Sequence, residues 1–138
     1  SSLSWHEIVT LASLIEKETG LDSERKIISS VFHNRLRKNM RLQTDPTVIY
    51  AIEKFDGNIR KRDLKIDSPY NTYRYKGLPP GPIANPGLKS IVAAMSPIES
   101  DHLYFVSRQD GSHHFSSTLN EHNQAVQKYQ LRKVRSRR

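Results

Sequence analysis

Two glutamates, Glu16 and Glu18, stand at the end of a predicted amphipathic helix, at the two edges of its apolar face. Apolar surroundings disfavour the charged form of a carboxyl group and raise its pKa toward neutrality, as general acid catalysis near pH 7 requires. On the helical wheel leucines flank Glu18, while Val9 and Ala12 flank Glu16, so the wheel does not choose between them. The alternative is that both are solvated charges at a helix end, because Glu is rarely buried without a partner.

The helix that carries these glutamates begins with a capping box formed by Ser4 and Glu7, followed by apolar residues at helical spacing. Asp45, read as an N-cap before a proline, starts another helix, and Thr118 with Glu121 forms a second capping box. Together these patterns predict helices over residues 4–18, 23–38, 45 to about 56, 62–66, 88–95 and 118–131, and a β-hairpin from residues 103–106 and 113–115.

Two loops between these elements gather polar side chains that have no obvious structural role. One spans residues 41–45, and the other spans residues 70–73 inside a proline-rich segment, 67–87, which we expect to be an ordered loop or a pair of short strands. Glutamine and asparagine carry both a donor and an acceptor, and tyrosine offers a flat face and a hydroxyl, the mixture that a sugar-binding cleft uses. For Asn71 or Thr44 alone loop capping is the better explanation, but convergence of these loops on one acid favours a binding site.

The composition limits the possibilities further. A chain of 138 residues fits one domain, and the absence of cysteine excludes disulfides, thiolate metal ligands and cysteine nucleophiles. No segment has the length and apolarity of a membrane span, and no signal peptide is recognisable. If the natural protein is exported or anchored, we expect these residues to be a piece of it, with the membrane anchor outside them.

The formal net charge of +8 is concentrated in two segments, 60–65 and 128–138. The second holds six of the 22 lysines and arginines and no acid. Such charge favours an anionic partner, namely nucleic acid, phospholipid or an acidic polymer. For the basic tail the alternative is a solvated chain end, and we expect residues 132–138 to be disordered.

Two adjacent histidines, His113 and His114, lie in the predicted hairpin. Neighbouring residues of a strand point to opposite faces, so the pair cannot readily bind one metal ion together. We therefore expect no metal site, and a structural His114 that packs beside Phe105 and Phe115.

Five motifs in order resemble the successive signatures of the YceG-like family, the endolytic lytic transglycosylases of bacterial cell walls. The resemblance covers nearly all of residues 5–130, and the order of the motifs makes it specific. The motifs are IEKET at 15–19, RLQTDPT at 41–47, YNTY at 70–73, GLPPGPI at 77–83 and LYFV at 103–106.

The family is similar to the wider lysozyme-like transglycosylases, whose catalytic Glu precedes a Ser on a helix, with a Gln-containing loop and a Tyr-Asn loop later in the chain. Glu18 followed by Thr matches the Glu-Ser pair, so the resemblance selects Glu18 over Glu16. It implies a catalytic domain at residues 1–131 with an α+β fold, mostly helical and lysozyme-like, with a small β-hairpin. Besides Glu18, the site residues that it implies are Gln43, Thr44, Tyr70, Asn71 and Tyr73.

The implied activity is cleavage of the MurNAc-β-1,4-GlcNAc bond of peptidoglycan, with a 1,6-anhydro-MurNAc end as product. Glu18 would act first as acid and then as base, so no cofactor is needed, and Asp45 is better explained as an N-cap than as a nucleophile. The partners would be glycan strands and the cell-wall synthesis machinery, at the extracytoplasmic side of the inner membrane. Two alternatives remain: a nucleic-acid-binding module that uses residues 60–65 and the basic tail, and a glycan-binding module without catalysis.

Overall fold

The computed structural model describes residues 2–131, and the expected disorder of residues 132–138 lies outside this range. The chain forms five α-helices and one two-stranded sheet within the described residues, an α+β fold as the sequence predicts. The elements are α1 (Trp5–Glu18), a 3-10 turn (Asp22–Glu24), α2 (Arg25–Arg37), α3 (Asp45–Ala51), a 3-10 turn (Lys61–Lys65), α4 (Leu88–Met95), β1 (Tyr104–Ser107), β2 (His113–Ser116), α5 (Leu119–Val126) and a π-helical turn (Gln127–Leu131).

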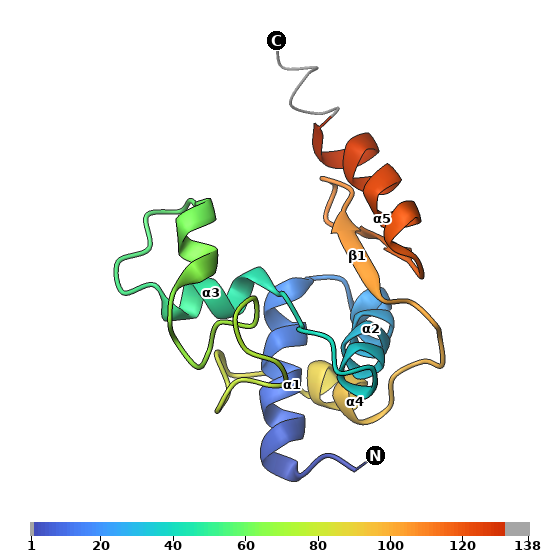
Figure 1. Cartoon of the computed structure of the whole chain (residues 1–138). Helices are drawn as coiled ribbons and strands as arrows, with labels where there is room; N and C mark the ends of the chain where they lie inside the picture. Colours follow the sequence, from blue (N-terminus) through green and yellow to red (C-terminus); the bar gives the residue numbers. More distant parts are fainter. Residues whose placement is uncertain (1, 132–138) are drawn as a thin grey trace.

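Helix α1 is the centre of the fold (Figure 1). Its apolar face contributes Leu11, Leu14 and Ile15 to the core, where they pack with residues of α2 and α4. Two small residues of α4, Ala93 and Ala94, belong to the same cluster and allow the two helices to approach closely. The capping box of Ser4 and Glu7 is confirmed at the start of the helix.

Two residues of the opposite, polar face of α1, Thr10 and Ser13, are buried as well, and the proline-rich segment contacts this face. The hydroxyl of Ser13 accepts a hydrogen bond from the backbone N–H of Ile83 at 3.0 Å and donates to the carbonyl of Thr10 at 2.6 Å. His6 contacts the carbonyl oxygen of Pro80 through its Nε2 at 2.6 Å. The segment contains no helix or strand over residues 67–87, and these side chains replace the backbone partners that regular structure would supply.

Several boundaries differ from the sequence prediction. Most are shifted by one or two residues, and the α-helical part of the last helix ends at Val126, with a π-helical turn up to Leu131. Helix α3 ends at Ala51, several residues before the predicted end. Its N-cap is Thr44, and Asp45 is the first helical residue, so the interpretation of Asp45 as the N-cap was wrong. The carboxylate of Asp45 instead accepts a hydrogen bond from the hydroxyl of Tyr73.

The hairpin and the final helix form the other side of the molecule. Strands β1 and β2 pair antiparallel, with Phe105 opposite Phe115, and α5 begins at the predicted capping box of Thr118 and Glu121. Figure 1 shows α3 on one side of the C-terminal end of α1 and the hairpin with α5 on the other. Every helix within residues 2–131 is too short or too polar to cross a bilayer.

Candidate active site

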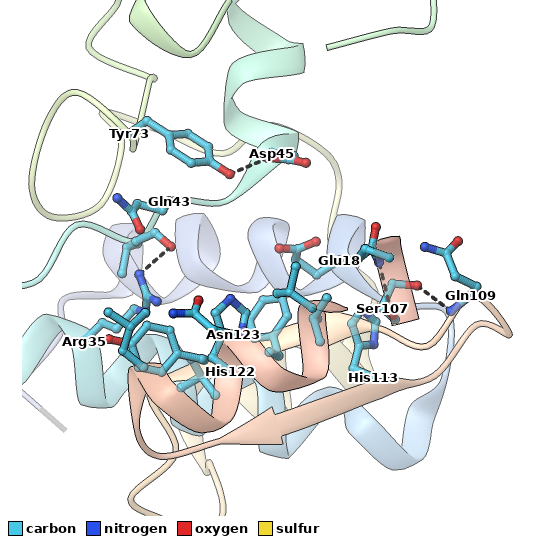
Figure 2. A pocket seen from close by; sticks show the side chains of 18 residues that line it. Glu18, Arg35, Gln43, Asp45, Tyr73, Ser107, Gln109, His113, His122 and Asn123 are labelled. Carbon is cyan, nitrogen blue, oxygen red and sulfur yellow. Dashed lines mark hydrogen bonds between the residues drawn. The ribbon is translucent and has the colours of Figure 1, made fainter. Parts of the chain in front are cut away.

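The C-terminal end of α1 opens into a cleft of about 680 Å³, and Glu18, the last residue of the helix, lies in its wall. One side of the cleft is formed by Gln43 and Asp45 together with Tyr73 of the proline-rich segment. The other side is formed by strand β1, by His113 of β2 and by α5. Figure 2 shows these side chains pointing into the same space.

The surroundings of Glu18 favour its protonated form. Burial raises the pKa of this carboxyl from 4.5 to about 7, and the negative charge of Asp45 adds to the rise. The hydroxyl of Thr44 donates a hydrogen bond to Oε2 of Glu18 at 2.7 Å, which opposes the rise and fixes the carboxyl group. A carboxyl group with this pKa can both donate and accept a proton near neutral pH.

The surroundings of Glu16 have the opposite effect. Its Oε1 accepts a hydrogen bond from the backbone N–H of Gly87 at 2.9 Å and another from the hydroxyl of Ser90 at 2.8 Å, and these two bonds lower its pKa. Gly87 is the N-cap of α4, so the carboxylate of Glu16 lies at the positive end of that helix. Glu16 is therefore a structural anion that ties α1 to α4, and the geometry separates the two glutamates without reference to any resemblance.

Gln43 and Thr44 lie where the sequence predicts, beside the candidate acid. The backbone N–H of Gln43 donates to the carbonyl of Thr72 at 3.3 Å, and that of Thr44 donates to the hydroxyl of Thr72 at 3.0 Å. Gln43 has a φ of 50°, an unfavourable backbone conformation for a residue other than glycine, and its side chain lines the cleft. Thr44 is buried and its hydroxyl contacts Glu18. Its position therefore fits a residue that orients the acid, and not one that contacts a ligand.

Asn71 and Tyr70 do not line the cleft, in contrast to what their motif suggests. The side chain of Asn71 has no exposed surface, and its amide donates to the carbonyls of Leu64 and Ile66 at 3.0 and 2.9 Å. Its Oδ1 accepts from the backbone N–H of Tyr73 at 3.0 Å. Asn71 thus holds its loop together, in agreement with loop capping, which the sequence analysis favours for this residue alone. The ring of Tyr70 packs on the ring of Tyr50 instead, with the centroids 4.7 Å apart.

The packing that the sequence analysis expects of His114 is wrong for that residue. His113, rather than His114, packs against Phe105 and Phe115, at centroid distances of 5.5 and 6.3 Å. Its Nδ1 lies 2.8 Å from Oε1 of the buried Glu24, and its backbone N–H donates to Oε2 of the same residue at 2.8 Å. His114 lies beside Tyr129. The register of the hairpin, and with it the face on which each histidine lies, could not be read from the sequence.

Sequence reasoning missed the far wall of the cleft. Arg35 of α2 lines it, with its guanidinium donating to the carbonyl of Leu103 at 2.6 Å and to that of Arg41 at 2.8 Å. His122 and Asn123 of α5 line it as well. Each is an ordinary helical residue in the sequence. Arg35 lies in the cleft wall from α2, held by the two carbonyls, and the packing of α5 beside the hairpin brings His122 and Asn123 into the cleft. Residues 2–131 contain no group of three or more His, Asp or Glu side chains that could hold a metal ion.

Comparisons with known proteins show the family to which the chain belongs. The family model described as YceG-like family matches residues 1–128. The chain is 51% identical over 129 residues to the endolytic murein transglycosylase of Bacillus subtilis, covering 94% of this chain and 36% of the relative. It is 38% identical over 131 residues to the endolytic murein transglycosylase of Streptococcus pneumoniae, covering 91% of this chain and 24% of that relative.

A crystal structure of a putative yceG-like protein from Listeria monocytogenes superposes with a TM-score of 0.81 at 52% identity, covering 88% of this chain and 39% of the other. The chain thus spans about a third of the length of the Bacillus subtilis relative and a quarter of the Streptococcus pneumoniae relative. On the family match and these identities, the chain belongs to the YceG-like family.

Proposed function

We propose that this chain is the catalytic domain of an endolytic peptidoglycan lytic transglycosylase, with Glu18 as its acid and base. The observation that carries the proposal is a carboxyl group with a pKa of about 7, held by Thr44 in the wall of an open cleft. The names of the relatives, endolytic murein transglycosylases, supply the substrate class. Murein is a wall polymer, so the site of action is the cell envelope, outside the cytoplasm.

The proposed reaction uses one carboxyl group twice. Protonated Glu18 gives its proton to the glycosidic oxygen of a MurNAc-β-1,4-GlcNAc bond, and the C1–O4 bond breaks with its electron pair going to that oxygen. Positive charge develops at C1 of the MurNAc ring. The Glu18 carboxylate then takes the proton of the 6-hydroxyl of the same ring while O6 bonds to C1. The products are a free GlcNAc 4-hydroxyl and a 1,6-anhydro-MurNAc end, no water is consumed, and Glu18 is protonated again.

Several side chains of the cleft fit contacts to a glycan. Gln43 offers a donor and an acceptor beside the acid, and Tyr73 offers an aromatic face. We propose these two as substrate contacts and Thr44 as the residue that orients Glu18. Tyr70 and Asn71 are left out, because neither lines the cleft and Asn71 is fully buried.

Product analysis tests the proposal. The protein is incubated with purified peptidoglycan, and the released fragments are identified by mass spectrometry. We expect glycan fragments with anhydro ends, which are one water molecule lighter than the corresponding reducing ends. Reducing ends would indicate hydrolysis, and intact glycan would favour the inert glycan-binding module. Intact glycan together with tight, steeply salt-dependent binding to DNA would favour the nucleic-acid alternative.

A further inference from the structure

A second carboxylate lies in the cleft and has no part in the single-glutamate reaction. Asp45, the first residue of α3, lines the cleft together with Glu18, and Figure 2 shows the side chain of Asp45 on the same side as Tyr73. The hydroxyl of Tyr73 donates a hydrogen bond to Oδ1 of Asp45 at 2.5 Å. The carboxylate is thus held in place from a loop 28 residues further along the chain.

The same loop that holds Asp45 is itself fixed from the interior. The backbone N–H of Tyr73 donates to the fully buried side chain of Asn71, whose amide is bonded to two backbone carbonyls. Burial, together with the bond to Asp45, raises the pKa of the Tyr73 hydroxyl, so that it remains a donor at neutral pH. Thr44, the neighbour of Asp45, holds Glu18 in turn. Both carboxyl groups of the cleft therefore accept a hydrogen bond from a hydroxyl group, and the segments that carry these hydroxyls are held by further hydrogen bonds.

The electrostatic effect of Asp45 on Glu18 agrees with separate roles for the two groups. The negative charge of Asp45 is the charged neighbour that raises the pKa of Glu18, in addition to burial. Paired carboxyl groups with different environments are a common basis for dividing the acid role from the charge-stabilising role. Five other ionisable side chains line the cleft: Arg35 of α2, Tyr73 of the proline-rich segment, Tyr104 of β1, His113 of β2 and His122 of α5.

We propose that Asp45, oriented by Tyr73, is a second catalytic residue, whose negative charge stabilises the positive charge that develops on the sugar when the glycosidic bond breaks. This inference rests on the proposed function. Asp45 forms no bond to the sugar and transfers no proton, so the reaction stays balanced as written above. A fixed charge directed at a developing charge stabilises the transition state more than the ground state, and its loss therefore lowers kcat rather than raising KM.

The test compares Asp45→Asn and Tyr73→Phe with a matched pair elsewhere on the proline-rich segment. The hydroxyl of Tyr75 donates to the carboxylate of Asp67, but neither residue lines the cleft, so Asp67→Asn and Tyr75→Phe serve as controls. The rate of anhydro-end formation on isolated glycan strands is measured against substrate concentration and pH, and thermal melting is recorded for each variant.

For Asp45→Asn we expect kcat to fall by roughly 100-fold with little change in KM, the scale of losing one electrostatic group of an active site. The alkaline limb of its pH–rate profile should move to lower pH, because the charge that raises the pKa of Glu18 is gone. Tyr73→Phe keeps the charge of Asp45 but removes the hydroxyl that orients it. We therefore expect kcat to fall by about 10-fold, with the alkaline limb of the pH–rate profile unmoved. Both control variants should retain the rate of the unmodified protein.

A folded Asp45→Asn variant with unchanged kcat and an unmoved alkaline limb would overturn the inference. The proposed function would still stand if Glu18→Gln were inactive in the same assay, whereas absence of cleavage by the unmodified protein would refute the function itself. If Asp45→Asn melts far below the unmodified protein, Asp45→Ser replaces it, since Ser is a smaller neutral polar residue that also removes the charge. The same loss of kcat is expected, and an unchanged kcat would again overturn the inference.

Discussion

The raised pKa of Glu18 predicts that this residue destabilises the folded protein at neutral pH. The perturbation is Glu18→Gln, which keeps the shape of the side chain and an acceptor for the hydroxyl of Thr44 but removes the ionisation. We expect the variant to be more stable than the unmodified protein above pH 7, although it should be catalytically inactive. A gain in stability on removal of an active-site group is the expected sign of a site selected for function.

The magnitude and the pH range follow from linkage. Below pH 4.5 Glu18 is protonated in both the folded and the unfolded chain, so it contributes no difference. Between pH 4.5 and about 7 the unfolded chain ionises while the folded protein keeps its proton, so the free energy of unfolding falls with rising pH. At 1.36 kcal/mol per pKa unit the full cost above pH 7 is about 3 kcal/mol. Glu18→Gln should therefore gain up to about 3 kcal/mol at pH 8 and little at pH 4.

The assay is urea unfolding of both proteins at several pH values between 4 and 8. The contributions of the other titrating groups cancel in the difference between the two free energies of unfolding. Glu16→Gln is the matched control, because the pKa of Glu16 is lowered by its bonds to Gly87 and Ser90. That lowered pKa stabilises the fold at neutral pH, and the stabilisation is lost as the pH falls. Glu16→Gln should therefore lower the free energy of unfolding at neutral pH, the opposite of Glu18→Gln. A stability difference between Glu18→Gln and the unmodified protein that does not change with pH would refute a raised pKa for Glu18.

Three further substitutions have distinct expected results. Thr44→Val removes the hydroxyl that lowers the pKa of Glu18, so the alkaline limb of the pH–rate profile should move to higher pH; an unmoved limb would contradict that role. Asn71→Ala leaves buried backbone groups of its loop without partners, so it should cost about 1–3 kcal/mol in urea unfolding; a cost near zero would mean that the loop does not depend on this side chain. Glu24→Ala leaves the ring and the backbone N–H of His113 without their partner and should cost about 1–3 kcal/mol in urea unfolding; an unchanged urea midpoint would contradict this.

Much of the helical frame could be predicted from local signals. In the capping boxes at Ser4 and Thr118 the two residues that bond each other are only three positions apart, so the sequence alone shows both partners. Helix α4 also has the predicted range, Leu88–Met95. The end of α3 was placed too late, because the apolar residue Ile52 continues the helical spacing after the helix has stopped at Ala51.

The environment of each ionisable residue depended on contacts between distant segments, and could not be predicted. Glu16 and Glu18 are equivalent on a helical wheel, but the partners that separate them, Gly87 and Thr44, lie 71 and 26 residues away. Asn71 has the residue type of a glycan contact and occupies a buried position, because burial of its loop was not encoded in a local pattern. The far wall of the cleft depends in the same way on how α5 packs against the hairpin.

The most direct test of the central claim is the cleavage of purified glycan strands by Glu18→Gln and Glu16→Gln, compared with the unmodified protein at equal amounts of folded protein. Gln cannot donate a proton, so we predict no detectable anhydro ends from Glu18→Gln and most of the activity from Glu16→Gln, whose carboxylate serves the packing of α1 on α4. Retained cleavage by Glu18→Gln, together with loss of cleavage by a folded Glu16→Gln, would contradict the assignment of Glu18 as the acid.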